Sequence, residues 1–337
     1  MSGSRPIVVA GAGSIGCFVG GMLALAGHRV VLLARPRVID EIKGHGLRLT
    51  SFEGADRRLP ASALVLSPDE QVLRDAAIVL VCVKSADTAE MAATIAAHAP
   101  QDAVIVSLQN GVANVPALKA HLASQRVLAG MVPFNVVGMG EGRYHRSTSG
   151  DIIIEQDEAA TAAKLSVADL KVQPSENISG VQWGKLLVNL GNALNALSNL
   201  PLREQLSQRS WRMLIADQMS EALAAMKAEG IDPVSTTPLP ASWVPYVMRL
   251  PDWAFQMIAK RMVQIDPQAR SSMWDDLQRG RRTEIDYLQG AIIEIAQRRR
   301  LAAPLSSRLV ALIKDAEARG QGSPGLSPEQ IRSSSRS

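Results

Sequence analysis

The sequence predicts an α/β domain with a mainly parallel β-sheet, followed by an all-α domain. Over roughly the first half of the chain, short apolar runs of strand length alternate with helical patterns, whereas only long helical patterns follow. The length of 337 residues also suits two domains. We therefore expect an α/β domain over 1–175, a helical substrate-binding domain over 176–319 and a tail over 320–337. The tail is rich in Ser, Gly, Pro and Arg, so we expect it to be disordered.

The first elements form a βαβ unit. Ile7 to Ala10 is a short apolar run that ends at a glycine, which is typical of a buried strand. A helical pattern follows over 14–26, and the apolar run 29–34 is the second strand. This context makes the turn between the first strand and the helix a dinucleotide-binding fingerprint, as in Rossmann-type domains, with the pyrophosphate at the positive end of the helix. The turn consists of Gly11, Ala12, Gly13, Ser14, Ile15 and Gly16.

The remaining elements continue this order. Residues 36–75 are less regular and give no detailed prediction. We expect strands at 77–83, 103–108, 127–133 and 152–155, with helices at 87–97 and 113–122. After residue 176, the expected helices are 179–199, 203–229, 238–264, 273–299 and 303–318. Ser272 and Asp275 resemble a capping box at the start of the fourth of these.

The residue after the second strand predicts the cofactor. An NAD site would place Asp or Glu there to accept a hydrogen bond from the ribose 2′-hydroxyl. This chain has Arg35, with Arg37 nearby. Arginine pairs with a 2′-phosphate, so we expect NADP(H), although a solvated loop arginine is the simpler alternative.

Two further loops follow strands of the expected sheet. Val83-Lys84-Ser85 follows one strand, and Gln109-Asn110-Gly111 follows the next. Ligands of such sheets bind at the carboxyl ends of parallel strands, so Lys84 and Asn110 are candidate cofactor-binding residues. A solvent-exposed lysine and a plain Asn-Gly turn are the structural alternatives.

A row of amides follows Lys185 in the first helix of the second domain. At about 100° per residue, Asn189, Asn192 and Asn199 fall within roughly 40° of Lys185, and Asn195 lies at the edge of this sector. We call these five residues the polar stripe; leucines occupy the other side. Asparagine is unfavourable inside a helix, and solvent-exposed faces usually carry Glu, Lys and Arg, so the polar stripe favours a lined pocket.

Lysine in such a pocket suits ketone reduction. Hydride attack on a carbonyl builds negative charge on oxygen, which a nearby ammonium stabilises and protonates. Partial burial would lower the lysine pKa and make it a better acid. A neighbouring carboxylate would fix its position, and Glu284 and Asp286 are both candidates that spacing alone does not separate.

Composition excludes several classes of function. The formal net charge of +4 is too small to predict a nucleic-acid partner but suits a small anionic ligand. The two cysteines, Cys17 and Cys82, form no metal-type pair, so we expect two reduced buried thiols, no metal site and a cytoplasmic location. No apolar run reaches about 18 residues and no signal peptide is recognisable, so we expect no membrane span.

In their order and spacing, the motifs resemble those of the ketopantoate reductase (2-dehydropantoate 2-reductase) family. The resemblance extends from Ile7 to about Ala318. It depends on the glycine turn, Val83-Lys84-Ser85, Gln109-Asn110-Gly111, Trp183-Gly184-Lys185-Leu186-Leu187-Val188-Asn189, Ser271-Ser272-Met273, and Arg282-Thr283-Glu284-Ile285-Asp286-Tyr287.

The resemblance implies an NADP-dependent oxidoreductase that reduces 2-dehydropantoate to (R)-pantoate, a step in pantothenate and coenzyme A biosynthesis, in the cleft between its two domains. It implies that Lys185 is the proton donor and that Glu284, rather than Asp286, lies close to this lysine and to the cofactor ribose. The other implied roles are a cofactor loop for Lys84, contact with nicotinamide and substrate for Asn110, and substrate binding for Asn189 and for Ser272 near the carboxylate.

The chain departs from the family pattern in its substrate pocket. The second asparagine of the family usually lies eight positions after the lysine, where this chain has Ala193, so Asn192 or Asn195 would take that role. The loop 130–135 also differs from the commoner threonine-rich version. Another 2-oxo acid, or the substrate of a related hydroxyacid or polyol-phosphate dehydrogenase, is therefore an alternative. A non-catalytic NADP-binding regulator is the alternative from another class, and the apolar helices are compatible with a homodimer.

Overall fold

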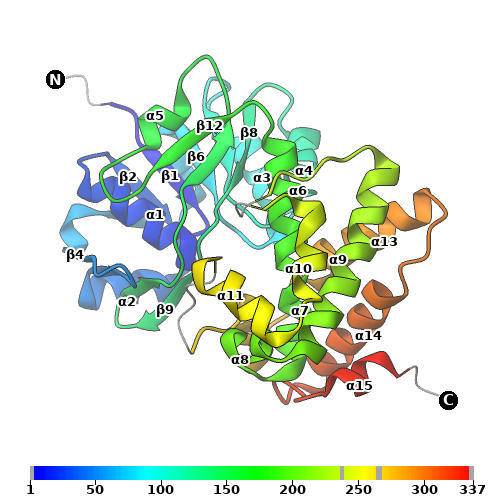
Figure 1. Cartoon of the computed structure of the whole chain (residues 1–337). Coiled ribbons are helices and arrows are strands. Elements are labelled where there is room, and N and C mark those ends of the chain that lie inside the picture. Colours follow the sequence, from blue (N-terminus) through cyan, green and yellow to red (C-terminus); the bar gives the residue numbers. More distant parts are fainter. Residues whose placement is uncertain (1–3, 236–238, 263–267, 334–337) are drawn as a thin grey trace. The chain divides into compact units, whose positions relative to one another are not determined.

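The computed structural model describes residues 4–235, 239–262 and 268–333, and the chain divides into two compact units. Unit 1 is Met1–Ile178 and unit 2 is Ser179–Ser337. The sequence placed the boundary after residue 175. Each unit is described separately below, and Figure 1 labels their elements.

Unit 1 is built on an eight-stranded sheet with the order β12-β11-β8-β7-β6-β1-β2-β5. All neighbouring strands are parallel except β8 and β11, which are antiparallel. The prediction of an α/β domain with a mainly parallel sheet is therefore confirmed. The strands are β1 (Ile7–Ala10), β2 (Val30–Leu33), β5 (Val65–Ser67), β6 (Ile78–Val81), β7 (Val104–Ser107), β8 (Arg126–Met131), β11 (Ile152–Glu155) and β12 (Val172–Ser175).

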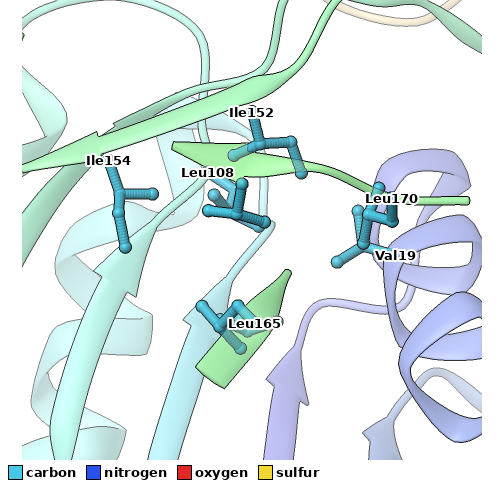
Figure 2. A pocket seen from close by; sticks show the side chains of 8 residues that line it. Val19, Leu108, Ile152, Ile154, Leu165 and Leu170 are labelled. Atoms are coloured by element: carbon cyan, nitrogen blue, oxygen red, sulfur yellow. The ribbon is translucent and has the colours of Figure 1, made fainter. Parts of the chain in front are cut away.

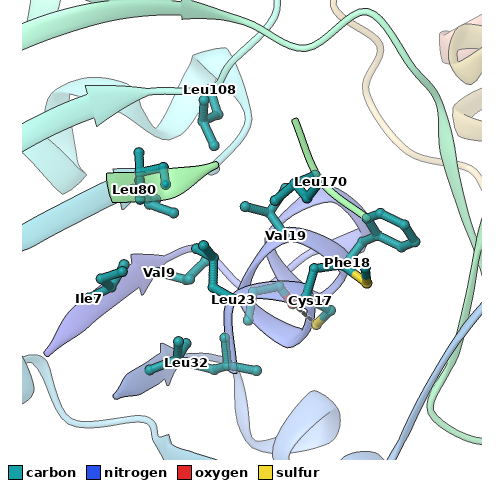
Figure 3. Close-up of a cluster of buried hydrophobic side chains, with 14 of the residues drawn as sticks. Ile7, Val9, Cys17, Phe18, Val19, Leu23, Leu32, Leu80, Leu108 and Leu170 are labelled. Atoms are coloured by element: carbon teal, nitrogen blue, oxygen red, sulfur yellow. Dashed lines mark hydrogen bonds between the residues drawn. The ribbon is translucent and has the colours of Figure 1, made fainter. Parts of the chain in front are cut away.

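Helix α1 (Ser14–Leu25) packs its apolar side chains on this sheet. Figure 3 shows Phe18, Val19 and Leu23 of α1 in one buried cluster with Val9 and Leu80 of the sheet. Each such buried side chain contributes about 1.5–3 kcal/mol to stability. The other helices of unit 1 are α2 (Pro36–His45), α3 (Thr88–His98), α4 (Asn114–His121) and α5 (Thr161–Leu165).

A second sheet of four strands, in the order β4-β3-β10-β9, lies outside the sequence-based prediction. Its strands are β3 (Leu47–Ser51), β4 (Asp56–Leu59), β9 (Val136–Gly140) and β10 (Arg143–Arg146). Leu47, Leu49 and Tyr144 are buried, and a Cβ atom at Gly21 of α1 would lie 2.7 Å from Leu49. The sheet therefore packs against the same helix that follows the glycine turn.

A small apolar cavity lies between the large sheet, α1 and α5 (Figure 2). Its volume is about 10 Å³, hardly one water molecule, and its lining has no polar surface. It is therefore a packing void and not a ligand site. It is lined by Val19, Leu80, Leu108, Ile152, Ile154, Leu165, Leu170 and Val172.

Unit 2 consists of helices in its described part, which confirms the all-α prediction. Four of the long predicted helices are divided, at Leu190, at Gln208, over 249–251 and over 279–284, and parts of 238–264 lie outside the described residues. None of the helices described combines the length and apolarity needed to cross a bilayer. The helices are α6 (Ile178–Asn189), α7 (Gly191–Ser198), α8 (Leu202–Ser207), α9 (Arg209–Glu229), α10 (Val244–Met248), α11 (Asp252–Met262), α12 (Ser272–Gln278), α13 (Ile285–Arg298), α14 (Pro304–Arg319) and α15 (Pro328–Arg332).

The expectation of a disordered tail is wrong for residues 320–333. The Ser323 hydroxyl donates to the carbonyl of Ala196, and the backbone N–H of Leu326 donates to the carbonyl of Leu197 at 2.8 Å. Ser327 starts α15 with a complete capping box, and Ile331 is fully buried. The buried side chain of Ile331 and the hydrogen bonds to the carbonyls of Ala196 and Leu197 thus attach this polar segment to unit 2. Residues 334–337 lie outside the described part.

Candidate functional site

The glycine turn connects β1 to α1 and lies against two neighbouring strand ends. The backbone N–H groups of Gly11 and Ala12 lie 3.3 and 3.2 Å from the carbonyl of Leu33, at the end of β2. Gly11 has φ +99°, and a Cβ atom there would lie 2.7 Å from the backbone nitrogen of Val83. The fold itself therefore requires glycine at position 11.

The other two glycines of the turn differ in what they touch. A Cβ atom at Gly16 would lie 2.5 Å from the carbonyl oxygen of Gly11, so α1 can approach the turn only with glycine there. A Cβ atom at Gly13 would meet no atom within 4 Å, and the φ of −82° is ordinary. The protein's own packing therefore does not require Gly13. The open space lies at the N-cap of α1, where no side chain caps the helix and no acidic residue occupies the first turn, which fits a pyrophosphate.

Arginines follow β2 at the same sheet edge as the glycine turn, because β1 and β2 are parallel. Arg35 is the N-cap of α2 and is exposed, and Arg37 is also exposed one residue after Pro36. This places two guanidinium-bearing residues where a carboxylate would stand in an NAD site.

The loops after β6 and β7 are locked together by buried amides. The Gln109 side chain donates to the Val83 carbonyl at 3.1 Å and to the Thr88 hydroxyl at 2.8 Å. The Asn114 side chain donates to the Asn110 carbonyl at 2.5 Å. This network fixes the backbone around Lys84 and Asn110, whose exposed side chains lie at the carboxyl ends of the strands. Gln109 belongs to a motif noted in the sequence, but the sequence did not predict that its side chain connects the two loops. It also did not predict the roles of Thr88 and Asn114 in this network.

In unit 2, Lys185 lies on α6 and is partly buried. Burial lowers its pKa from 10.5 to about 8, because the charged form loses hydration. Asn189 lies one turn further along the same helix and is 8% exposed. Next to Lys185, a Cβ atom at Gly184 would overlap the carbonyl oxygen of Val234, whose N–H donates to the Gly180 carbonyl at 2.8 Å. The Val234 backbone therefore passes directly over α6 beside the lysine.

The polar stripe is divided between two helices, because α6 and α7 meet at Leu190. Asn195, on α7, is fully buried: its carboxamide accepts from the Ser271 N–H at 2.9 Å and donates to the Leu200 carbonyl at 2.9 Å. Asn199 adopts a left-handed conformation after α7, and its oxygen accepts from the Trp274 ring N–H at 2.8 Å. These two amides have structural roles, which leaves Asn192 as the candidate second amide.

The expected helix cap at Ser272 is wrong by one residue. Ser271 is the N-cap of α12, and its hydroxyl accepts from the Trp274 N–H at 3.2 Å. The same hydroxyl donates to the Asn192 carbonyl at 3.1 Å. Ser272 is therefore the first residue of the helix and is exposed. The Ser272 hydroxyl is not used to cap the helix, so capping does not prevent the predicted contact with the substrate.

The two candidate carboxylates differ in their surroundings. Asp286 forms an ion pair with Lys314 at 2.7 Å, and both side chains are more than half exposed. Glu284 is the N-cap of α13 and is partly buried. The Asp286 carboxylate is thus paired at the surface of unit 2, so Glu284 is the better candidate. The described residues contain no group of three or more metal-ligating side chains that could hold an ion.

Comparisons with known proteins agree on one family. The model described as "Ketopantoate reductase PanE/ApbA" matches residues 7–158, and its C-terminal counterpart matches 177–317. A solved PanE/ApbA family ketopantoate reductase from Ralstonia eutropha JMP134 is 33% identical, with a TM-score of 0.80, over 94% of this chain and 99% of that one. The 2-dehydropantoate 2-reductase of Halobacterium salinarum is 28% identical over 93% of this chain and 99% of its own. A D-mandelate dehydrogenase solved with NADH and anilino(oxo)acetate shares the fold, with a TM-score of 0.76 and 24% identity over 94% and 99% of the two chains.

Proposed function

Because the chain belongs to the ketopantoate reductase family, we propose that this oxidoreductase uses NADPH to reduce a 2-oxo acid, with 2-dehydropantoate as the expected substrate and (R)-pantoate as the product. The observation that carries the proposal is the partly buried Lys185, whose pKa burial lowers to about 8. An amine with such a pKa is still mainly protonated near pH 7 and gives up its proton more readily than a free lysine.

The proposed chemistry assigns one role to each polar group of unit 2. When bound, the cofactor supplies the hydride. Lys185 Nζ donates a hydrogen bond to the substrate carbonyl oxygen and then a proton as negative charge develops there. Asn189 and Asn192 donate hydrogen bonds that orient the substrate, and the Ser272 hydroxyl donates to its carboxylate. Glu284 holds the Lys185 ammonium in place and accepts from a cofactor ribose hydroxyl.

Unit 1 would hold the dinucleotide through groups at the carboxyl ends of its parallel strands. The space left by Gly13 and the N-terminal amides of α1 suit the pyrophosphate. Arg35 would pair with the 2′-phosphate, which favours NADPH over NADH. Lys84 would contact the cofactor, and Asn110 would contact the nicotinamide and the substrate.

A substrate panel tests the proposal directly. We expect NADPH oxidation, followed by absorbance, with 2-dehydropantoate, and slower or no reaction with NADH and with aryl 2-oxo acids. Lys185→Ala should lower turnover by ~10²-fold or more, because the acid is removed. Lys314→Ala, which changes an exposed lysine of the same unit, is the matched control and should react like the wild type.

Three results would contradict parts of this proposal. Turnover of Lys185→Ala close to the wild type would remove Lys185 as the donor. Faster reduction of another 2-oxo acid would change the substrate but keep the chemistry. Binding of NADPH with no oxidation by any 2-oxo acid would favour a regulator.

A further inference from the structure

A buried glutamine connects two of the helices that carry the candidate catalytic residues. Gln289 lies on α13, is fully buried, and its side-chain amide donates to the carbonyl of Leu190 at 2.8 Å. Leu190 is the single residue between Asn189 at the end of α6 and Gly191 at the start of α7. Its own dihedral angles stay helical (φ −55°, ψ −33°) and its N–H donates to the Leu186 carbonyl at 2.9 Å, so the α6–α7 break is an interruption of one residue. One hydrogen bond thus joins α13 to the α6–α7 break.

The amide at position 289 is unusual for its surroundings. The other buried residues of α13 are apolar or alanine, so an apolar side chain would suit the packing better. Burying an amide is unfavourable unless its hydrogen bonds are made. The amide nitrogen makes such a bond, to Leu190, whereas the amide oxygen has no partner among the described residues. The bond to Leu190 is therefore the reason we assign for a glutamine here, and what it fixes is the backbone position of the break.

The break separates the residues proposed to meet the substrate. Lys185 and Asn189 lie on α6, and Asn192 lies on α7, so the geometry between them depends on how the chain passes through Leu190. Glu284 is the N-cap of the helix that carries Gln289. A bond from α13 to the break therefore fixes the lysine helix relative to the start of the helix that carries the glutamate.

We propose that Gln289 is a positioning residue: its bond to Leu190 sets the geometry of the α6–α7 break and, through it, the placement of Lys185 and the substrate-binding amides. This inference rests on the proposed function for its catalytic consequence. Its structural part, the fixed break, stands without it.

Unit 2 contains a matched control for this bond. Gln218 on α9 is also fully buried, and neither its amide nitrogen nor its amide oxygen has a hydrogen-bond partner among the residues that the structure describes. Gln289→Met and Gln218→Met make the same chemical change, an amide to a thioether of similar length. Only the first removes a bond to the α6–α7 break.

Two measurements on the full-length protein test the proposal. We expect backbone hydrogen exchange over 189–193 to accelerate at least tenfold in Gln289→Met and to stay within about twofold of wild type in Gln218→Met. We expect kcat with the best 2-oxo acid to fall on the order of tenfold in Gln289→Met, because a small displacement of a donor is costly to catalysis. The dissociation constant of NADPH should change less than kcat, since all the residues proposed to hold the dinucleotide belong to unit 1 except Glu284 at the start of α13.

Each outcome supports or overturns the proposal. Equal exchange in the two variants overturns the fixed break, and faster exchange with unchanged kcat overturns the positioning role. If the wild type reduces no 2-oxo acid, the proposed function fails, and the exchange data alone decide whether Gln289 fixes the break. Gln289→Asn, which keeps a donor but is one methylene shorter, is the second variant should the Met variant not fold; we expect the same direction with a smaller effect.

Discussion

Lys185 combines two physical requirements in one side chain. Its position on α6 buries much of the side chain, so burial lowers its pKa to about 8 and the amine releases its proton more readily. An ordinary surface lysine would remain charged at all physiological pH values and would be a poor acid. The environment of this one amine therefore decides whether unit 2 can act as a proton donor.

The pH dependence of turnover follows from this shift. Because the folded-state pKa is lowered to about 8, the ammonium is present below that pH and is lost as the pH rises through it. We expect kcat for reduction to be level below about pH 8 and to fall roughly tenfold per pH unit above it. Lys185→Arg keeps its charge, so any residual activity should lack this alkaline decline. A wild-type decline only near 10.5 would mean that the amine is not buried when it acts.

Arg35 is the residue that we propose decides the preference between NADPH and NADH. Arg35→Ala should raise the dissociation constant of NADPH by about tenfold or more and leave that of NADH nearly unchanged, because only NADPH carries the 2′-phosphate. Isothermal titration measures both constants. Arg29→Ala is the control, since Arg29 is also exposed but lies just before β2, at the opposite sheet edge. Equal losses for the two cofactors would argue against the phosphate contact.

At the scale of elements, the glycines of the turn have different roles: Gly11 is required by the fold, whereas Gly13 is expected to matter only for cofactor binding. Gly13→Ala should leave the melting temperature unchanged, because the added methyl group meets no atom, but should weaken NADPH binding at least tenfold by occupying the pyrophosphate space. Gly11→Ala should instead lower the melting temperature, because it combines a positive φ with a clash at Val83. Calorimetry and cofactor titration of both variants make the comparison. A large stability loss in Gly13→Ala would show that the turn needs Gly13 for itself.

The sequence predicted the elements whose patterns are local. The strands and helices of the βαβ unit follow directly from apolar runs and glycines. The second sheet was missed because β3 and β4 carry Arg48, Arg57 and Arg58, and because β3 pairs with β10, about 95 residues away in the chain. The break at Leu190 was missed because leucines continue the helical period across it. The carbonyl of Leu190 accepts a hydrogen bond from Gln289, which is distant in sequence.

The candidate site was predictable to a similar extent. Spacing identified Lys185 and Asn189, and the family resemblance favoured Glu284. Spacing could not show that the Asn195 amide is committed to Ser271, or that Ser271 rather than Ser272 caps α12. The first fact depends on segments about 75 residues apart meeting in unit 2, which no local pattern reports, and the second is a shift of one residue at a helix start.

At the scale of the whole molecule, the C-terminal segment is part of unit 2. Ile331→Ala should lower the free energy of unfolding of unit 2 by about 2–5 kcal/mol, because it leaves a cavity under α15. Tryptophan fluorescence during urea unfolding reports on this unit alone, since Trp183, Trp211, Trp243, Trp253 and Trp274 all lie in it. Leu301→Ala, at a residue 42% exposed, is the control and should cost far less. Equal effects would mean that α15 is not docked.

The contact between Gly184 and Val234 has a consequence for protein engineering. The backbones of Gly184 and Val234 are in direct contact, with no side chain between them. Any residue with a side chain at position 184 would therefore force the segment after α9 outward. A chimaera that imports this connection from a relative must bring a compatible neighbour for position 184. Otherwise the clash would displace the adjacent Lys185 first, and an exchange intended to alter substrate choice would also change the acidity of the proposed proton donor.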